Sequence, residues 1–98
     1  MKVRWSSRSL KDLREIGDFI RRDNPAAARR WVHSLQERAR KAASLPRAGR
    51  VVPELDLDNV REVFLGNYRI VYRLRENGIE ILTVSEGHRL LPIDPPED

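Results

Sequence analysis

Residues 60–92 read VREVFLGNYRIVYRLRENGIEILTVSEGHRLLP and contain three short runs in which apolar and polar side chains alternate. The dipeptides Gly66-Asn67 and Asn77-Gly78 separate the runs. Both accept the positive φ angles that two-residue hairpin turns need at their central positions. The stretch therefore predicts an antiparallel meander of three strands, and such tight turns also predict which side chains share a face of the sheet.

The two predicted faces of this meander differ in character. One is almost entirely hydrocarbon and requires a cover. It carries Arg61, Val63, Leu65, Tyr68, Ile70, Tyr72, Leu74, Ile79, Ile81 and Thr83. The other mixes charged and apolar side chains, which is typical of a solvated or partner-binding surface. It carries Glu62, Phe64, Arg69, Val71, Arg73, Glu80, Leu82, Val84 and Glu86.

The predicted register also specifies cross-strand neighbours. Arg69 is expected opposite Glu86, and Val71 opposite Val84. A turn one residue longer at Asn77 would move every side chain of the third strand to the opposite face.

The segment before the meander predicts a short strand and a helical hairpin. Lys2–Trp5 is the strand candidate, and Ser6 or Ser7 is a suitable N-cap for a first helix that ends near Asp23. Asn24-Pro25 then caps a second helix that ends before Pro46, with proline at its first position. Both helices have an apolar stripe, made by Leu10, Leu13, Ile16, Phe19 and Ile20 in the first and by Ala28, Trp31, Val32, Leu35, Ala39, Ala42 and Leu45 in the second.

The predicted fold is therefore α+β, in the order β-α-α-β-β-β. The helical hairpin packs on the hydrocarbon face of a small, mostly antiparallel sheet. The segment 46–59 is expected to be a loop because it contains Gly49, Pro53 and three acidic residues. Residues 1–92 are expected to form one domain, with 93–98 as a flexible C-terminal tail rich in proline and acids.

Composition narrows the possible functions. The 98 residues contain no cysteine, which excludes disulfides, thiol catalysis and cysteine-based zinc sites. The two histidines, His33 and His88, are far apart in sequence, so no metal and no cofactor is expected. No apolar run approaches about 18 residues, so we expect a cytoplasmic protein without membrane contact. The net charge of +4 favours an anionic partner, either nucleic acid or an acidic protein.

One group of side chains could carry chemistry. Antiparallel geometry brings the start of the second meander strand close to the end of the third. The group consists of Arg69, Arg73, His88 and Arg89, with Glu62 and Glu86 nearby. Arginines around a phosphate, with His or Glu to move a proton, suit RNA cleavage. The same charges suit docking on an acidic protein, and a simple surface ion pair between Arg69 and Glu86 would explain them equally well.

Several blocks together resemble the RelE/ParE toxin superfamily of type II toxin–antitoxin modules, and the ParE branch most closely. The resemblance covers residues 2–92 and rests on Asn24-Pro25-Ala26-Ala27-Ala28 at the helix bend, Pro46-Arg47-Ala48-Gly49-Arg50, Val60-Arg61-Glu62 and Tyr68-Arg69-Ile70-Val71-Tyr72-Arg73. It implies a RelE/ParE-like fold, and a cognate antitoxin that wraps the toxin as helix and extended strand.

The superfamily includes two mechanistic classes, and the resemblance implies different residue roles in each. RelE-like members cut mRNA at the ribosome, whereas ParE-like members inhibit DNA gyrase and have no hydrolytic site. Arg69 and Arg89 match RelE-type positions, but the RelE lysine pair aligns with Val60 and Glu62, and the RelE tyrosine falls in the tail. A carboxylate in place of a cation works against phosphate stabilisation.

The resemblance therefore favours a gyrase inhibitor whose target-binding residues are Arg69, Arg73, His88 and Arg89. The alternative is an mRNA endoribonuclease. Its catalytic residues would be Arg69, His88, Arg89 and Glu62, in imitation of the Glu–Arg–His set of some relatives, with Glu86 as a substitute for Glu62. An inactive relative is the third reading.

Overall fold

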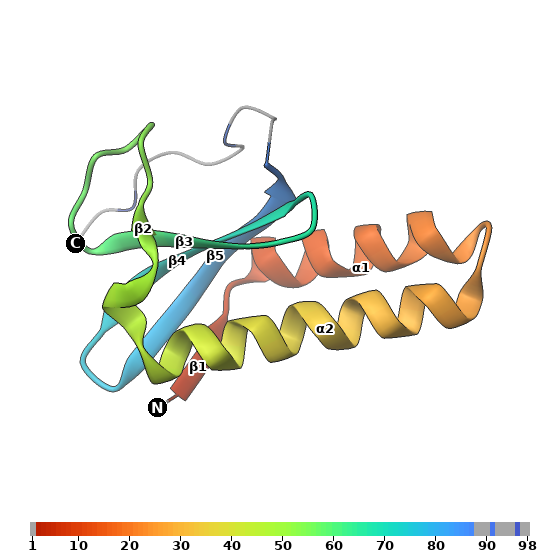
Figure 1. Cartoon of the computed structure of the whole chain (residues 1–98), viewed down its shortest axis with the longest axis horizontal. Helices are drawn as coiled ribbons and strands as arrows, with labels where there is room; N and C mark the ends of the chain where they lie inside the picture. The colour runs from red at the N-terminus through yellow and green to blue at the C-terminus, as the bar shows by residue number, and fades with distance from the viewer. Residues whose placement is uncertain (1, 88–90, 92–95, 97–98) are drawn as a thin grey trace.

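Two antiparallel helices cover one face of a five-stranded sheet (Figure 1). The computed structural model describes residues 2–87, 91 and 96. The elements are β1 (Lys2–Trp5), α1 (Ser7–Arg21), α2 (Pro25–Ser44), the 3₁₀ turn η1 (Pro46–Ala48), β2 (Arg50–Val51), β3 (Val60–Leu65), β4 (Tyr68–Arg75) and β5 (Gly78–Glu86). The strand order is β1-β5-β4-β3-β2, with β1 parallel to β5 and the other pairs antiparallel. The predicted α+β class is confirmed, and the expected loop contains the additional short strand β2.

The helix boundaries follow the predicted caps. The Ser6 hydroxyl accepts a hydrogen bond from the Ser9 N–H at 3.0 Å and begins α1. The Asn24 side chain accepts one from the Ala27 N–H at 3.0 Å and begins α2, with Pro25 at the first helical position. Within the described residues, neither helix is long and apolar enough to cross a bilayer.

The main core lies between the helices and the sheet. Its buried members are Leu13, Leu35, Ala39, Ala42, Ala43, Val63, Ile70, Tyr72, Ile79, Ile81 and Val84. Tyr72 is completely buried, as the alternation predicts, and its hydroxyl donates a hydrogen bond to the Pro46 carbonyl at 2.6 Å. Trp31 is only partly buried and meets the Tyr68 ring edge-on, with 5.6 Å between ring centroids.

The first hairpin has the predicted register, with Leu65 opposite Tyr68. Of the residues in its turn, only Gly66 has a positive φ, at +57°. This pattern fits a type II′ turn, in which the first central residue alone needs a positive φ.

The predicted register of the second hairpin is wrong. Its turn lies one residue earlier than expected, so that Arg75 is opposite Gly78. A β-bulge then interrupts the ladder between Val71 and Tyr72. As a result Arg69 is opposite Ser85, not Glu86.

The bulge exchanges the faces of the sheet to which the side chains at the end of β5 point. Ile81 pairs with Tyr72 and Thr83 with Val71, which leaves Leu82 without a partner in the ladder. Val84 therefore lies opposite Ile70 and joins the helix-facing core, although the regular alternation placed it on the other face.

The face of the sheet away from the helices is partly covered, contrary to the expectation of a solvated surface. The segment 52–59 folds over it. A second, smaller core forms there from Val52, Val60 and Val71, with Leu55, Leu57, Leu82 and Leu91 packed against it. Glu62 and Arg69 are buried under the same cover.

Two predictions concern the C-terminal end of the chain. His88 and Arg89 lie outside the described residues. The same is true of the expected tail 93–98, apart from Pro96, so the boundary at residue 92 stays a prediction.

Removal of the Tyr72 side chain should destabilise the fold strongly. We expect Tyr72→Ala to lower the free energy of unfolding by about 3–5 kcal/mol, since it leaves a cavity in the main core. Tyr72→Phe should lower it by only about 1 kcal/mol, through the hydrogen bond to Pro46. Urea denaturation followed by circular dichroism measures both. Phe19→Ala, at a side chain that is 67% exposed, is the control and should change little. A Tyr72→Ala protein as stable as this control would contradict the core assignment.

Candidate functional site

Four charged side chains form an ion-pair network on the sheet face opposite the helices. Arg69 on β4 makes a two-pronged contact with Glu54, from Nη1 to Oε1 at 3.0 Å and from Nη2 to Oε2 at 2.8 Å. The same Nη1 lies 3.1 Å from Oε1 of Glu62 on β3. The other oxygen of Glu62 accepts from Nε of Arg50 at 2.7 Å. Arg69 and Glu62 thus occupy the centre of the network, with Glu54 and Arg50 at its ends.

Burial increases toward the centre of this network. Arg69 is 3% exposed and Glu62 1%, whereas Glu54 and Arg50 reach solvent. The hydrogen bond from Arg69 holds the pKa of Glu54 below its ordinary value of 4.5. Hydrogen bonding to Glu54 in turn raises the pKa of Arg69. The Arg69 guanidinium therefore stays charged, between two carboxylates.

Arg73 belongs to a separate cluster. It lies four residues along β4 from Arg69, a distance of roughly 13 Å in an extended strand. Its Nη2 lies 2.9 Å from Oε1 of Glu80 on β5, and Nε of Arg75 lies 3.9 Å from the same oxygen. The structure thus does not bring Arg69 and Arg73 to one point, as a single phosphate site would require.

The other predicted site residues have different positions. Glu86 lies opposite Tyr68, and its charge raises the pKa of Tyr68, although burial of that side chain raises it more. The predicted approach of His88 and Arg89 to Arg69 lies outside the described residues. His33 is an exposed residue of α2.

Sequence reasoning missed Glu54 and Arg50. Both belong to the segment expected to be a loop, and only its run of acidic residues hinted at a partner for a buried arginine. Arg50 also places its guanidinium 5.6 Å from the centre of the Phe64 ring, a partly exposed aromatic on β3. Through Glu54 and its ion pair with Arg69, the 52–59 cover is connected to the sheet by charge as well as by apolar packing.

This arrangement has limited scope for catalysis. A guanidinium that neutralises two carboxylates is poorly placed to stabilise a phosphorane-like transition state, because the carboxylates would repel the incoming phosphate. The central carboxylate, Glu62, is buried and contacts two arginines. Among the described residues, no group of three His, Cys, Asp or Glu side chains could hold a metal ion.

The described residues thus form a helical hairpin on a mixed five-stranded sheet whose outer face carries arginines paired with carboxylates. The chain belongs to the family described as "ParE toxin of type II toxin-antitoxin system, parDE", whose model matches residues 3–91. Apart from Lys2, the first residue of β1, the described sheet and both helices lie within this match.

Two individual comparisons agree with this family. The chain is 36% identical over 93 residues to "Putative toxin Y4kP" of Sinorhizobium fredii, and the aligned region covers 93% of each protein. Its fold is similar to that of a solved chain of the chromosomal ParDE TA system from P. aeruginosa, with a TM-score of 0.72 and 21% identity. That comparison covers 88% of this chain and 95% of the other.

Replacement of the central arginine, Arg69, should lower the free energy of unfolding more than replacement of an exposed arginine. We expect Arg69→Met to lower the free energy of unfolding by about 3–5 kcal/mol, because it leaves Glu62 buried with a weaker set of partners. The double variant Arg69→Met/Glu62→Met should recover much of this loss, since no uncompensated charge remains. Urea denaturation provides the comparison, with the exposed Arg14→Met as control. Equal effects of Arg69→Met and Arg14→Met would show that the network contributes nothing.

The network should also make stability depend on pH in the acid range. The folded-state pKa of Glu54 is below its ordinary value, so its carboxylate stabilises the fold above about pH 4.5. This contribution is lost as the pH falls through the lower folded-state pKa. We therefore expect the urea midpoint of wild type to exceed that of Glu54→Gln at pH 7, and the difference to shrink and vanish as the pH falls below the folded-state pKa of Glu54. The exposed Glu15→Gln is the control, and a pH-independent difference for Glu54→Gln would be the contrary result.

Proposed function

We propose that this ParE-family toxin acts by inhibiting DNA gyrase and has no hydrolytic activity. The observation that supports this most directly is the state of Arg69. Its guanidinium is buried and contacts Glu54 and Glu62, so it does not present an open cationic site to a scissile phosphate.

The residues at the RelE-type lysine positions support the same conclusion. Val60 is completely buried in the smaller core, and Glu62 is the central acid of the network. A nuclease of the RelE type would need cations there to neutralise charge on the transition state. In this chain one position is apolar and the other carries the opposite charge.

We propose that the target contacts a surface that includes Arg69, Arg73, His88 and Arg89. Arg73 lies under partial cover beside Glu80. Arg69 would reach a partner only if Glu54, the exposed acid at the end of the network, turned away into solvent. Target binding would then replace the ion pair between Arg69 and Glu54 with one between Arg69 and a carboxylate of the partner, at a small net electrostatic cost.

Membership of a type II toxin family implies a cognate antitoxin. We propose that part of it binds along the helical hairpin, which extends well beyond the edge of the sheet (Figure 1). α1 exposes Leu10 and Phe19, two large apolar side chains on its stripe. An amphipathic antitoxin helix could bury them against its own apolar face. Gyrase and the alternative target, the ribosome with its mRNA, are both cytoplasmic, so we propose a cytoplasmic site of action.

A supercoiling assay tests the proposed target. Purified protein should inhibit supercoiling of relaxed plasmid by gyrase, or increase cleaved DNA, in a reaction without ribosomes or mRNA. Arg73→Gln should raise the inhibitory concentration about tenfold, as loss of one well-placed charge costs about 1.4 kcal/mol of binding. Arg14→Gln, an exposed helical arginine, is the matched control and should inhibit like wild type.

The contrary outcome is equally specific. Site-specific cuts in translated mRNA, together with fully active gyrase, would show that the protein is a ribonuclease. Arg69 variants are unsuitable as the main test, because the buried network makes loss of activity and loss of stability difficult to separate.

A further inference from the structure

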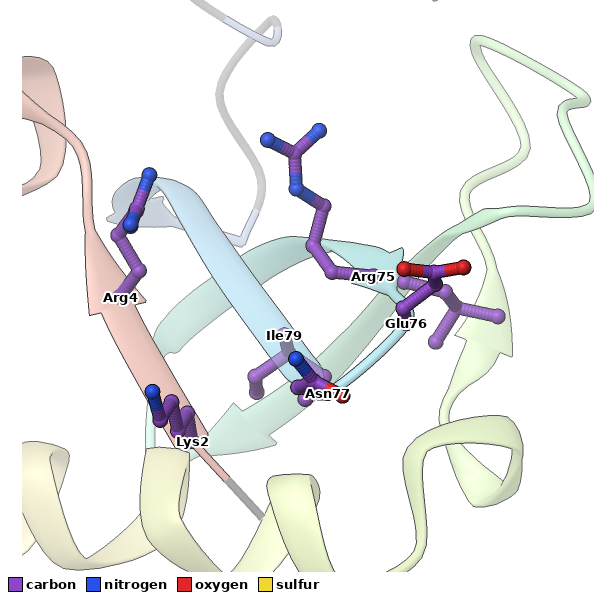
Figure 2. Close-up of a pocket in the computed structure, with 8 residues that line it drawn as sticks. Lys2, Arg4, Arg75, Glu76, Asn77 and Ile79 are labelled. Carbon is purple, nitrogen blue, oxygen red and sulfur yellow. The ribbon is translucent and has the colours of Figure 1, made fainter.

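A second charged site lies at the opposite end of the sheet from the Arg69 network. A pocket of about 510 Å³ opens between β1 and the β4–β5 turn (Figure 2). It is lined by Lys2, Arg4, Leu74, Arg75, Glu76, Asn77, Gly78 and Ile79. Neither the family resemblance nor the gyrase proposal uses this pocket.

Strand register explains how the cations come to surround it. Gly78 on β5 pairs with Lys2 on one side and with Arg75 on the other. Lys2 and Arg75 are therefore two strand spacings apart, roughly 10 Å, with a residue that has no side chain between them. Arg4 lies two residues along β1 from Lys2. Figure 2 shows that the side chains of Arg4 and Arg75, which flank β5, project from the same face of the sheet.

Backbone contacts keep this geometry in place. The Lys2 N–H donates a hydrogen bond to the Asn77 carbonyl at 2.9 Å, which ties the start of β1 to the turn. Gly78 has a φ of +157°, and a Cβ atom there would lie 1.9 Å from the Lys2 carbonyl oxygen. The gap between the two cations therefore depends on glycine at this position.

The cations of the pocket are available to a ligand. Lys2 and Arg4 are exposed, and neither makes an ion pair with any described residue. Arg75 is about half exposed, and its 3.9 Å contact with Glu80 is longer than the 2.9 Å contact between that acid and Arg73. Glu80 is the strand neighbour of Arg4 as well as of Arg73, and its 2.9 Å ion pair is with Arg73. Glu76, the acid in the pocket lining, lies in the exposed turn.

We infer that this pocket binds phosphate groups of a nucleic-acid backbone. The planar guanidinium groups of Arg4 and Arg75 can each form two parallel hydrogen bonds to phosphate oxygens, and the flexible Lys2 adds a third positive charge. An acidic protein is the less suitable ligand, because protein interfaces centre on buried apolar anchors. Leu74 and Ile79 are turned to the helix-facing core, and no large apolar side chain that is exposed among the described residues lines this pocket. One of them, Leu45, lines a neighbouring pocket that shares Leu74 and Arg75.

Fluorescence anisotropy with labelled oligonucleotides tests this site, in a reaction that contains no gyrase. Single-stranded DNA, duplex DNA and RNA of one sequence distinguish the possible sources of the backbone. For single strands, three phosphate contacts should give a slope of log K against log salt of about −2. The triple variant Lys2→Gln/Arg4→Gln/Arg75→Gln should bind at least about tenfold more weakly at low salt and should lose most of this slope.

A charge-matched variant separates the pocket from the general basicity of the chain. Arg22→Gln/Arg29→Gln/Arg30→Gln removes the same charge from exposed positions near the helix bend, at the far end of the molecule (Figure 1). It should retain most of the affinity and the slope. Equal losses of affinity in the two triple variants would overturn the inference. Displacement of the oligonucleotide by poly-glutamate, added at the same concentration of negative charge, would also overturn it. Binding by the pocket with no effect on gyrase would leave the inference intact and overturn only the proposed function.

Discussion

The carboxylate of Asp12 holds the helical layer to the sheet at the point where β5 is irregular. Its Oδ2 accepts a hydrogen bond from the Thr83 hydroxyl and another, at 3.1 Å, from the Val84 N–H. Its Oδ1 lies 3.0 Å from Nε of Arg8, one turn earlier in α1. A bulge leaves ladder groups without strand partners, and such groups are costly when buried. Here the Leu82 carbonyl accepts a hydrogen bond from the Ser6 hydroxyl at 3.1 Å, and the Val84 N–H donates to Asp12. The first helix and its N-cap therefore bind backbone groups around the bulge, so the irregular strand and the helix position support each other.

The bulge also divides the outer face of the sheet into two regions with different chemistry. Before it, β5 presents Gly78 and Glu80 beside the cations of β1 and β4, and this region forms an open pocket. Around and beyond it, the 52–59 segment covers Val71 and Arg69. Arginines on the same strand, β4, therefore have different environments. Arg69 is enclosed by carboxylates, whereas Arg75 is about half exposed to solvent.

The environment of Arg69 shows how neighbouring residues limit what an arginine can do. An arginine in the Tyr-Arg step of β4 is compatible with either activity when only the sequence is considered. Its neighbours decide what it can do: two carboxylates convert a potential phosphate ligand into part of a buried ion-pair network. The network connects the 52–59 cover to the sheet, and the cover in turn shields this face of the sheet from solvent.

The amino-acid sequence by itself determined the features that depend on neighbouring residues. Both helix N-caps, the antiparallel helical hairpin, the first β-turn at Gly66 and the burial of Tyr72 follow from local capping, periodicity and alternation. Only the tertiary structure decided the register of β5 and the partners of Arg69. Strand alternation has a period of two, so one bulged residue reverses every later side chain, and the bulge is stabilised by an aspartate 71 positions away in sequence. Likewise, the acid that neutralises Arg69 comes from a loop 15 residues earlier, whose path no local pattern specifies.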